Sequence, residues 1–478
     1  MSIEHIRPIS SIKLGPPDIL FINVPASFQQ GIIPDEEMPP FGILRLATTT
    51  EQHGHRPMLL DAHRAKLNLS EIDNVLYELK PKSVGINPTS INVLEAQGIA
   101  ELCDQRKIPL ILGGVHATLD PFTAIEKDFP MARAVVKGKG EKVVSQILND
   151  IELNQQTKMK GVYYSDTDKT ITDFADYYTL NQLPLIDQKR WVENPLTKKN
   201  IQINGKDIEL TEISLYETSG CPFQCTYCAT PNLVDKNNGN KAYYRPTMNR
   251  ILTDVKSSIE LGANAIHFID DLAFAKPNHF HEFANGIKKL KLSNQLYWRG
   301  MTRAPIIADQ CSNEDLTIIA QSGCWRIAMG IESGDEKMIK RIKKNITLEQ
   351  TRKAVNKLRA AGIPQVKAFF VMGFPEETLE QIEATYKFIM ELKNLGLTDI
   401  SIFQFKPYPG TEEWQYLERT NPNVLKNLFY VKQGINNSIV DRKIARDATL
   451  PDDLQIAAVS SRIVKEIIIK TMKDFYDN

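Results

Sequence analysis

The sequence lacks the features that mark a membrane-spanning or secreted chain. It contains no apolar run of about 18 residues, the length that a transmembrane helix needs. Its first residues, MSIEHIRPISSIK, include no apolar segment of a secretory signal. The 6 cysteines are too few and too unevenly spaced for a disulfide framework. We therefore expect a cytoplasmic protein with no membrane partner.

Neither sign of charge is in excess, because 58 Lys and Arg residues balance 58 Asp and Glu residues. Such a chain has no diffuse basic field for a phosphate backbone, so nucleic acid is not an expected partner. Hydrophobic residues make up 42% of the chain and charged residues 24%, as in globular rather than disordered proteins. The 478 residues suggest about three domain-sized units.

Short apolar runs alternate with helical patterns in residues 15–150. The runs lie in DILFINVP, HRPMLLDA, SVGINPTS, PLILGGVH and ARAVVKGKGE. Strands that alternate with helices predict a doubly wound parallel sheet, a Rossmann-like α/β domain. Ligands bind beyond the carboxyl ends of such strands. The residues at those ends include Thr89, Ser90, Gly113, Gly114 and His116.

A second alternating series occupies residues 211–411, after a stretch (151–210) whose pattern is weaker. Within that stretch GVYYSD and ITDF fit a hairpin, and we interpret the whole stretch as a connector. Six βα units predict a full or partial TIM-like barrel with its chemistry at the strand carboxyl ends. The six predicted strands span residues 213–217, 265–269, 296–303, 326–330, 365–371 and 400–405.

Capping patterns place several helices. Thr347 with Gln350 predicts a helix start, and Gly362 predicts its end. Residues 412–478 are expected to form a helical extension, in which 451–478 read as one helix with a stripe of apolar side chains. That stripe consists of Ile456, Val459, Ile463 and Ile467. The lysines within residues 340–344 are typical of a solvated helix end.

Three cysteines fall within eight residues, as Cys221-Pro-Phe-Gln-Cys225-Thr-Tyr-Cys228. Structural zinc normally takes four protein ligands, and no other Cys or His occurs between His116 and His267. Three thiolates on a four-iron cluster leave one iron open to a substrate or cofactor. The spacing therefore favours an iron–sulfur cluster, with zinc or unligated thiols as alternatives. Cys103, Cys311 and Cys324 lie apart in apolar surroundings and are expected in the core.

The cysteine motif and four later motifs resemble the radical S-adenosylmethionine (SAM) superfamily. An aromatic residue, Tyr227, precedes the last cysteine, as in that family. The later motifs are Phe268-Ile269-Asp270-Asp271, Met329-Gly330-Ile331-Glu332-Ser333-Gly334, Phe370-Val371-Met372-Gly373-Phe374-Pro375-Glu376-Glu377-Thr378 and Phe405-Lys406-Pro407-Tyr408-Pro409-Gly410-Thr411. The five motifs occur in the order found in the superfamily, and the first and last of these four are most similar to its cobalamin-associated branch.

This resemblance implies a role for each motif. Cys221, Cys225 and Cys228 would bind a [4Fe-4S] cluster whose open iron chelates SAM. The residues expected to contact the cofactor are Tyr227, Glu332, Ser333, Gly373 and Pro375. Asp270, Asp271 and Arg303 are the candidate catalytic residues. The two aspartates would act near the substrate or cap the next helix, and Arg303 would pair with the cofactor carboxylate or with a structural acid. The cluster's electron would cleave SAM to methionine and a 5'-deoxyadenosyl radical, so we expect an external donor of the flavodoxin or ferredoxin type.

The amino-terminal half resembles the cobalamin-binding domain fused ahead of many such enzymes, through residues 39–47, 55–61 and 113–117. The resemblance implies that cobalamin binds at Thr89, Ser90, Gly113, Gly114 and His116. Asp61-Ala62-His63 departs from the Asp-x-His-x-x-Gly signature, because it follows the second strand and Lys66 replaces the glycine. We therefore expect cobalamin to bind without a histidine ligand from this segment.

The resemblance implies a radical SAM enzyme, and the favoured reaction is methylation of an unactivated carbon in a small natural-product intermediate. Methylcobalamin, recharged by a second SAM, would supply the methyl group. The alternative is a radical dehydration, rearrangement or ring modification, for example of a sugar or aminocyclitol, without methyl transfer. A non-catalytic or zinc-stabilised binding module is a third hypothesis, which the intact motifs disfavour.

Overall fold

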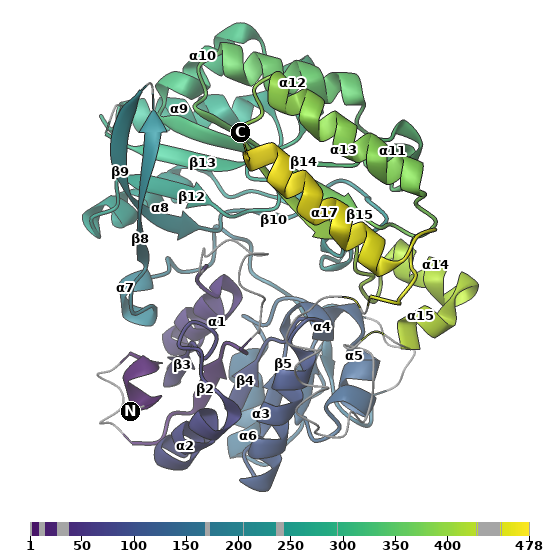
Figure 1. The fold of residues 1–478 in the computed structure, drawn as a ribbon. Coiled ribbons are helices and arrows are strands. Elements are labelled where there is room, and N and C mark those ends of the chain that lie inside the picture. The colour runs from purple at the N-terminus through teal and green to yellow at the C-terminus, as the bar shows by residue number, and fades with distance from the viewer. Residues whose placement is uncertain are drawn as a thin grey trace.

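The computed structural model consists of two sheets, each covered by helices, with one sheet stacked above the other in Figure 1. It describes residues 2–8, 15–25, 38–167, 173–203, 205–235, 243–293, 295–426, 428, 450 and 452–477. No helix in these ranges is both long enough and apolar enough to cross a membrane.

The first sheet has seven strands in the order β1-β3-β2-β4-β5-β6-β7. The strands are β1 (Ile6–Arg7), β2 (Ile19–Ile22), β3 (Pro57–Leu60), β4 (Val84–Ile86), β5 (Leu110–Leu112), β6 (Ala134–Val136) and β7 (Val162–Tyr163). All pairs are parallel except β1 with β3 and β6 with β7 at the edges. The strand order reverses between β2 and β4, which is where a doubly wound sheet binds its ligand.

Helices cover both faces of this sheet. Because both faces are buried, successive residues of β2 enter different cores: Leu20 and Ile22 pack with α2 (Leu69–Leu79) and α3 (Val93–Gln105). Ile19 and Phe21 pack with α1 (Phe41–Gln52) and α6 (Val144–Glu152). Two short helices, α4 (Gly114–Leu119) and α5 (Pro121–Thr123), follow β5. The predicted doubly wound domain is confirmed.

The second sheet also has seven strands, in the order β16-β15-β14-β13-β12-β9-β8. They are β8 (Leu196–Ile203), β9 (Lys206–Leu215), β12 (Ala265–Phe268), β13 (Tyr297–Thr302), β14 (Cys324–Glu332), β15 (Gln365–Met372) and β16 (Asp399–Gln404). The six strands from β9 to β16 are parallel, whereas β8 pairs antiparallel with β9. The sheet is thus an open, partial barrel, which is one of the two predicted forms.

Helices on the outside of the second sheet alternate with its strands (Figure 1). They are α8 (Met248–Glu260), α9 (Pro277–Lys289), α10 (Asn313–Gln321), α11 (Glu336–Arg341), α12 (Leu348–Ala360) and α13 (Leu379–Asn394). Helix α12 begins with the predicted capping box: Thr347 accepts from the Gln350 amide and Gln350 accepts from the Thr347 amide. Gly362 follows its end at φ +83°.

The carboxyl-terminal segment differs from the sequence interpretation. The last helix, α17 (Ser461–Tyr476), starts later than residue 451, because Ser460 is extended and its hydroxyl accepts the Ile463 amide at the helix start. Ile456 and Val459 therefore precede the helix, and its buried side chains are Ser461, Val464, Thr471 and Phe475. Pro451 and Asn478 lie outside the described residues, whereas α14 (Glu412–Thr420) and α15 (Pro422–Lys426) complete the helical extension.

The stretch interpreted as a connector contributes to both sheets. Its strand β7 pairs with β6 rather than with ITDF, of which residues 171 and 172 lie outside the described residues. Strand β8 and the start of β9 extend the second sheet. The half-exposed face of this hairpin explains why its apolar pattern is weak.

The carboxyl ends of the two sheets face each other. Arg45 of α1, which follows β2, donates a hydrogen bond to the carbonyl of Tyr216 at the end of β9. Leu119 of α4, which follows β5, lies against Gly410, which follows β16. The two predicted ligand-binding edges therefore meet in the middle of the molecule.

Candidate functional site: the facing strand ends

The loop that carries the cysteine triad follows β9 and the short strand β10 (Ser219–Gly220), which pairs with β11 (Tyr243–Tyr244). Cys221, Cys225 and Cys228 are free thiols with partial exposure, whereas the other three cysteines are buried. The Cys228 amide donates to the Cys225 carbonyl at 3.2 Å, which closes a turn between these two. Burial raises the pKa of Cys221, and that of Cys228 to about 11.

This arrangement suits a polynuclear cluster better than zinc. Among the described residues, which include the whole triad, no three His, Cys, Asp or Glu side chains gather closely enough to hold one ion. A closed zinc site needs four ligands on a single metal, whereas thiolates on a cubane each bind a different iron. Three accessible thiols on one loop therefore fit the iron–sulfur interpretation.

Asp270 secures the chain before the triad. Its side chain is fully buried, and its Oδ1 atom accepts from the amides of Glu217 (2.8 Å) and Thr218 and from the Thr218 hydroxyl (2.7 Å). Burial raises the pKa of Asp270 to about 6, although these hydrogen bonds act to lower it. These contacts favour a positioning role for Asp270. Asp271 is exposed beside the loop, where its Oδ2 atom accepts from the Thr230 hydroxyl at 3.0 Å.

The carboxyl end of β14 brings Glu332 to the cysteine loop. Strand β14 has a bulge between Gly330 and Glu332, and Glu332 adopts φ +74°, an unfavourable backbone conformation for a residue with a side chain. The Glu332 carboxylate lies beside the Tyr227 phenol, whose pKa is raised by burial and by this carboxylate. Tyr227 and Glu332, both predicted to contact SAM, are thus brought together.

Ser333 and two residues of the turn after β15, Gly373 and Pro375, are buried within the protein. The fully buried Ser333 hydroxyl lies 3.2 Å from that of Thr385 on α13 and accepts the Asp335 amide, so it ties β14 to that helix. Gly373 follows β15 at φ +91°, and its amide donates to Glu377 at 2.6 Å. Pro375 is buried in the same turn.

Arg303 is buried after β13 and contacts the cysteine loop. Its guanidinium lies over the Phe223 ring, 3.7 Å from the centroid, and donates to the carbonyl of Lys344. It also lowers the pKa of Cys221, against the larger effect of burial. Among the described residues, no carboxylate pairs with Arg303, so the structure does not support the alternative of a structural acid as its partner.

The first sheet carries a pocket of about 430 Å³ at its carboxyl edge, near the point where the strand order reverses. Glycines line much of it, namely Gly85, Gly113, Gly114, Gly138 and Gly140, together with apolar residues of β2, β5, β6, α1 and α6. Gly114 has φ +80°, and a Cβ there would lie 2.8 Å from the Asn87 Cβ atom. Only glycine therefore lets the loops after β4 and β5 approach each other.

The polar groups beside this pocket could form hydrogen bonds with the nucleotide tail of cobalamin. The Asn87 Oδ1 and Ser90 Oγ atoms are buried, and neither has a hydrogen-bond partner within the described structure. Thr89 binds Asn92 through both its amide (2.7 Å) and its hydroxyl (3.0 Å), which shapes the loop. The Nε2 atom of His116 lies 2.8 Å from Asp128, whereas its buried Nδ1 atom has no hydrogen-bond partner within the described structure. His63 does not line the pocket.

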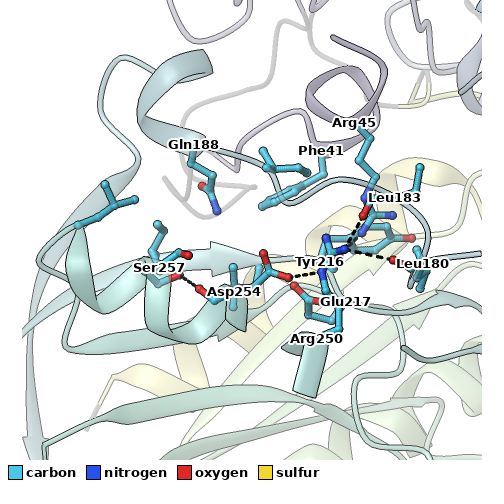
Figure 2. A pocket seen from close by; sticks show the side chains of 15 residues that line it. Phe41, Arg45, Leu180, Leu183, Gln188, Tyr216, Glu217, Arg250, Asp254 and Ser257 are labelled. Atoms are coloured by element: carbon cyan, nitrogen blue, oxygen red, sulfur yellow. Dashed lines mark hydrogen bonds and ion pairs between the residues drawn. The ribbon is translucent and has the colours of Figure 1, made fainter. Parts of the chain in front are cut away.

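Sequence reasoning missed two groups. Lys344, interpreted as solvated, is 7% exposed and pairs with Glu332. A second pocket, of about 530 Å³, lies between α1 and α8, with the carboxylates of Glu217 and Asp254 beside Arg250 and with Arg45 reaching in from α1 (Figure 2). Burial and the neighbouring Asp254 raise the pKa of Glu217. The motifs do not reveal either group, because each brings together residues from different elements.

Two family models match the chain. The model of the radical SAM superfamily matches residues 216–389, and that of the B12 binding domain matches residues 34–148. The first range contains the cysteine loop, and the second contains every lining residue of the glycine-lined pocket except Phe21.

Known proteins resemble most of the chain. An uncharacterised methyltransferase of Pyrococcus horikoshii is 25% identical over 90% of this chain and 89% of its own length. Cytidylyl-2-hydroxyethylphosphonate methyltransferase of Streptomyces wedmorensis is 24% identical over 83% of this chain and 82% of its own. Among solved structures, the radical SAM methyltransferase TsrM of Kitasatospora setae has a TM-score of 0.64 at 16% identity, over 84% of this chain and 76% of that one.

The chain belongs to the radical SAM superfamily, in the branch whose members carry a B12-binding domain. It is an enzyme whose cofactors are a [4Fe-4S] cluster, SAM and cobalamin.

Proposed function

We propose that this enzyme is a cobalamin-dependent radical SAM methyltransferase that acts on an unactivated carbon of a small natural-product intermediate. The observation that carries the proposal is the juxtaposition of two sites: the cysteine loop at the end of β9 and the glycine-lined pocket lie on facing strand ends, linked by Arg45 and Tyr216. Two relatives that span most of the chain are named methyltransferases.

Each part of the protein has a distinct task in this proposal. The bound cluster supplies the electron that cleaves SAM, and bound cobalamin supplies a transferable methyl group. Cys221, Cys225 and Cys228 hold the cluster, Asp270 fixes the loop, and Glu332 and Tyr227 line the SAM position. The two facing sheets exclude water from the reacting groups, which protects a radical from competing hydrogen donors.

The radical half of the proposal is tested by C225A beside C103A, both reconstituted without oxygen. Wild type and C103A are expected to hold about four irons per chain and to release 5'-deoxyadenosine from SAM after reduction with dithionite. C225A is expected to lose both properties. Release of the same product with reduced flavodoxin in place of dithionite would support the proposed class of electron donor. A colourless, iron-free wild type would refute the proposal.

The methyl-transfer half is tested without knowing the substrate. Wild type supplied with hydroxocobalamin, a reductant and methyl-labelled SAM is expected to retain cobalamin and to carry label on it. Retained cobalamin without label, together with release of 5'-deoxyadenosine, would favour the alternative of a radical dehydration, rearrangement or ring modification.

A further inference from the structure

Lys344 is a buried lysine that the motifs do not explain. It lies in the turn between α11 and α12, where its amide donates to the Ile339 carbonyl at 3.1 Å. Its Nζ atom lies 2.6 Å from the Glu332 Oε1 atom, and each side chain is less than a tenth exposed. A buried charge is stable only when it is paired, so each residue requires the other.

The end of β14 is built around this ion pair. A Cβ atom on Gly330 would collide with the Glu332 Oε1 atom and would lie 2.8 Å from Lys344 Nζ. The bulge and the positive φ of Glu332 turn the carboxylate into the space that Gly330 leaves open. Strained backbone of this kind persists only where the surrounding contacts fix it.

The turn that carries Lys344 also supports the cysteine loop. The Thr226 amide, between Cys225 and Cys228, donates to the Ile342 carbonyl at 3.0 Å. Arg303, which lies on the Phe223 ring, donates to the Lys344 carbonyl. Glu332 lies beside Tyr227. The turn thus contacts the cysteine loop directly through Ile342 and indirectly through Arg303 and Glu332.

We propose that Lys344 is a positioning residue for SAM: its ammonium group holds the Glu332 carboxylate beside the cysteine loop, in the orientation that bound SAM requires. This inference rests on the proposed function. It assigns Lys344 an effect on the affinity for SAM and no effect on cluster assembly.

The test compares K344M with K340M in the full chain, reconstituted without oxygen. Lys340 is exposed and lies only four residues away. K344M is expected to keep its iron and sulfide, while its KM for SAM in the release of 5'-deoxyadenosine rises about tenfold or more, as when a supporting contact around a bound group is lost. The change that SAM causes in the electron paramagnetic resonance spectrum of the reduced cluster should need correspondingly more SAM. K340M should match wild type in both measurements.

The double variant K344M/E332Q separates positioning from general damage. If Lys344 acts through Glu332, the double variant has a KM no higher than the worse single variant. It also removes the unpaired buried carboxylate that K344M leaves, so it folds even where K344M does not. Three results would overturn the role of Lys344. The first is an unchanged KM for SAM in cluster-loaded K344M, and the second is a KM in the double variant that multiplies the increases of the two single variants. The third is loss of the cluster from both K344M and the double variant. Failure of wild type to cleave SAM would instead overturn the proposed function.

Discussion

At the scale of single residues, the site depends on carboxylates held away from water. Glu377 is fully buried in the turn after β15, where its Oε2 atom accepts from the amides of Gly373 (2.6 Å) and Phe374 (3.1 Å). Its Oε1 atom has no partner among the described residues. Burial raises its pKa to about 7, although the two amides favour the ionised form. The turn that contains Gly373 and Pro375, two predicted SAM contacts, is therefore sensitive to pH.

The raised pKa of Glu377 predicts the sign of a pH effect. The unfolded chain releases this proton near pH 4.5 and the folded chain near pH 7. The folded state therefore loses stability as pH rises between these values, by at most about 3 kcal/mol, and loses no more above them. E377Q does not titrate and keeps an oxygen for the two amides. The melting temperature of E377Q relative to wild type should therefore rise between about pH 5 and about pH 8.

E383Q is the matched control for this prediction, because Glu383 is exposed on the helix that follows. Its melting temperature should keep a constant offset from wild type across the same pH range. If E377Q also kept a constant offset, the Glu377 carboxyl group would not change its ionisation over that range.

At the scale of elements, the sequence predicted what periodicity and capping control. Both sheets, the six parallel strands of the barrel and the start of α12 were predictable, because apolar runs and a capping box are local patterns. The start of α17 was not, because an extended Ser460 interrupts an apolar stripe that continues on both sides of it. The Lys344–Glu332 pair was not predictable either, because Lys344 looks like any surface lysine until the bulge in β14 brings a carboxylate to it.

Helix α17 provides one test at this scale. Val464 is 1% exposed and packs 3.2 Å from the position that a Cβ of Gly373 would occupy, so the helix supports the turn after β15. V464A should lower the free energy of unfolding by about 1–2 kcal/mol through the cavity that it leaves. I469A removes a larger side chain that is 56% exposed on the same helix, and should change stability by less than about 0.5 kcal/mol. Equal losses in the two variants would show that α17 does not pack against this turn in solution.

The glycine loop of the first sheet provides a second test. G114A places a Cβ against Asn87 at a residue with φ +80°. G54A has a similar backbone, with φ +87°, but no atom lies within 4 Å of its Cβ. Both should lose about 1 kcal/mol to backbone strain, but G114A alone should lose bound cobalamin, measured by absorbance after gel filtration. Iron content should be unchanged in both, and equal cobalamin retention would count against this pocket as the cobalamin site.

At the scale of the whole molecule, one of the two apolar cores of the first sheet is shared with segments that follow strands of the second sheet. The cluster that contains Leu20 and Ile22 of the first sheet also takes in Phe374, Phe405 and Leu417, which follow strands of the second. Helix α1 contacts both units, since Ile43 and Leu46 line the glycine pocket while Phe41 and Arg45 line the second pocket. We therefore expect ligand binding to the first sheet to stabilise the second.

Arg45 is the residue that tests this coupling. Its guanidinium donates to the Tyr216 carbonyl and lies 5.1 Å from the centre of the Tyr216 ring, five residues before Cys221 (Figure 2). R45M keeps most of the aliphatic stem but loses both contacts, at a cost of about 2 kcal/mol. In wild type, added cobalamin should raise the temperature at which the cluster loses its visible absorbance, because binding stabilises the shared core. In R45M that rise should be smaller while cobalamin is still retained, and R419M, which alters an exposed arginine on α14, should behave as wild type. A rise as large in R45M as in wild type would mean that the shared core couples the two sheets without this contact.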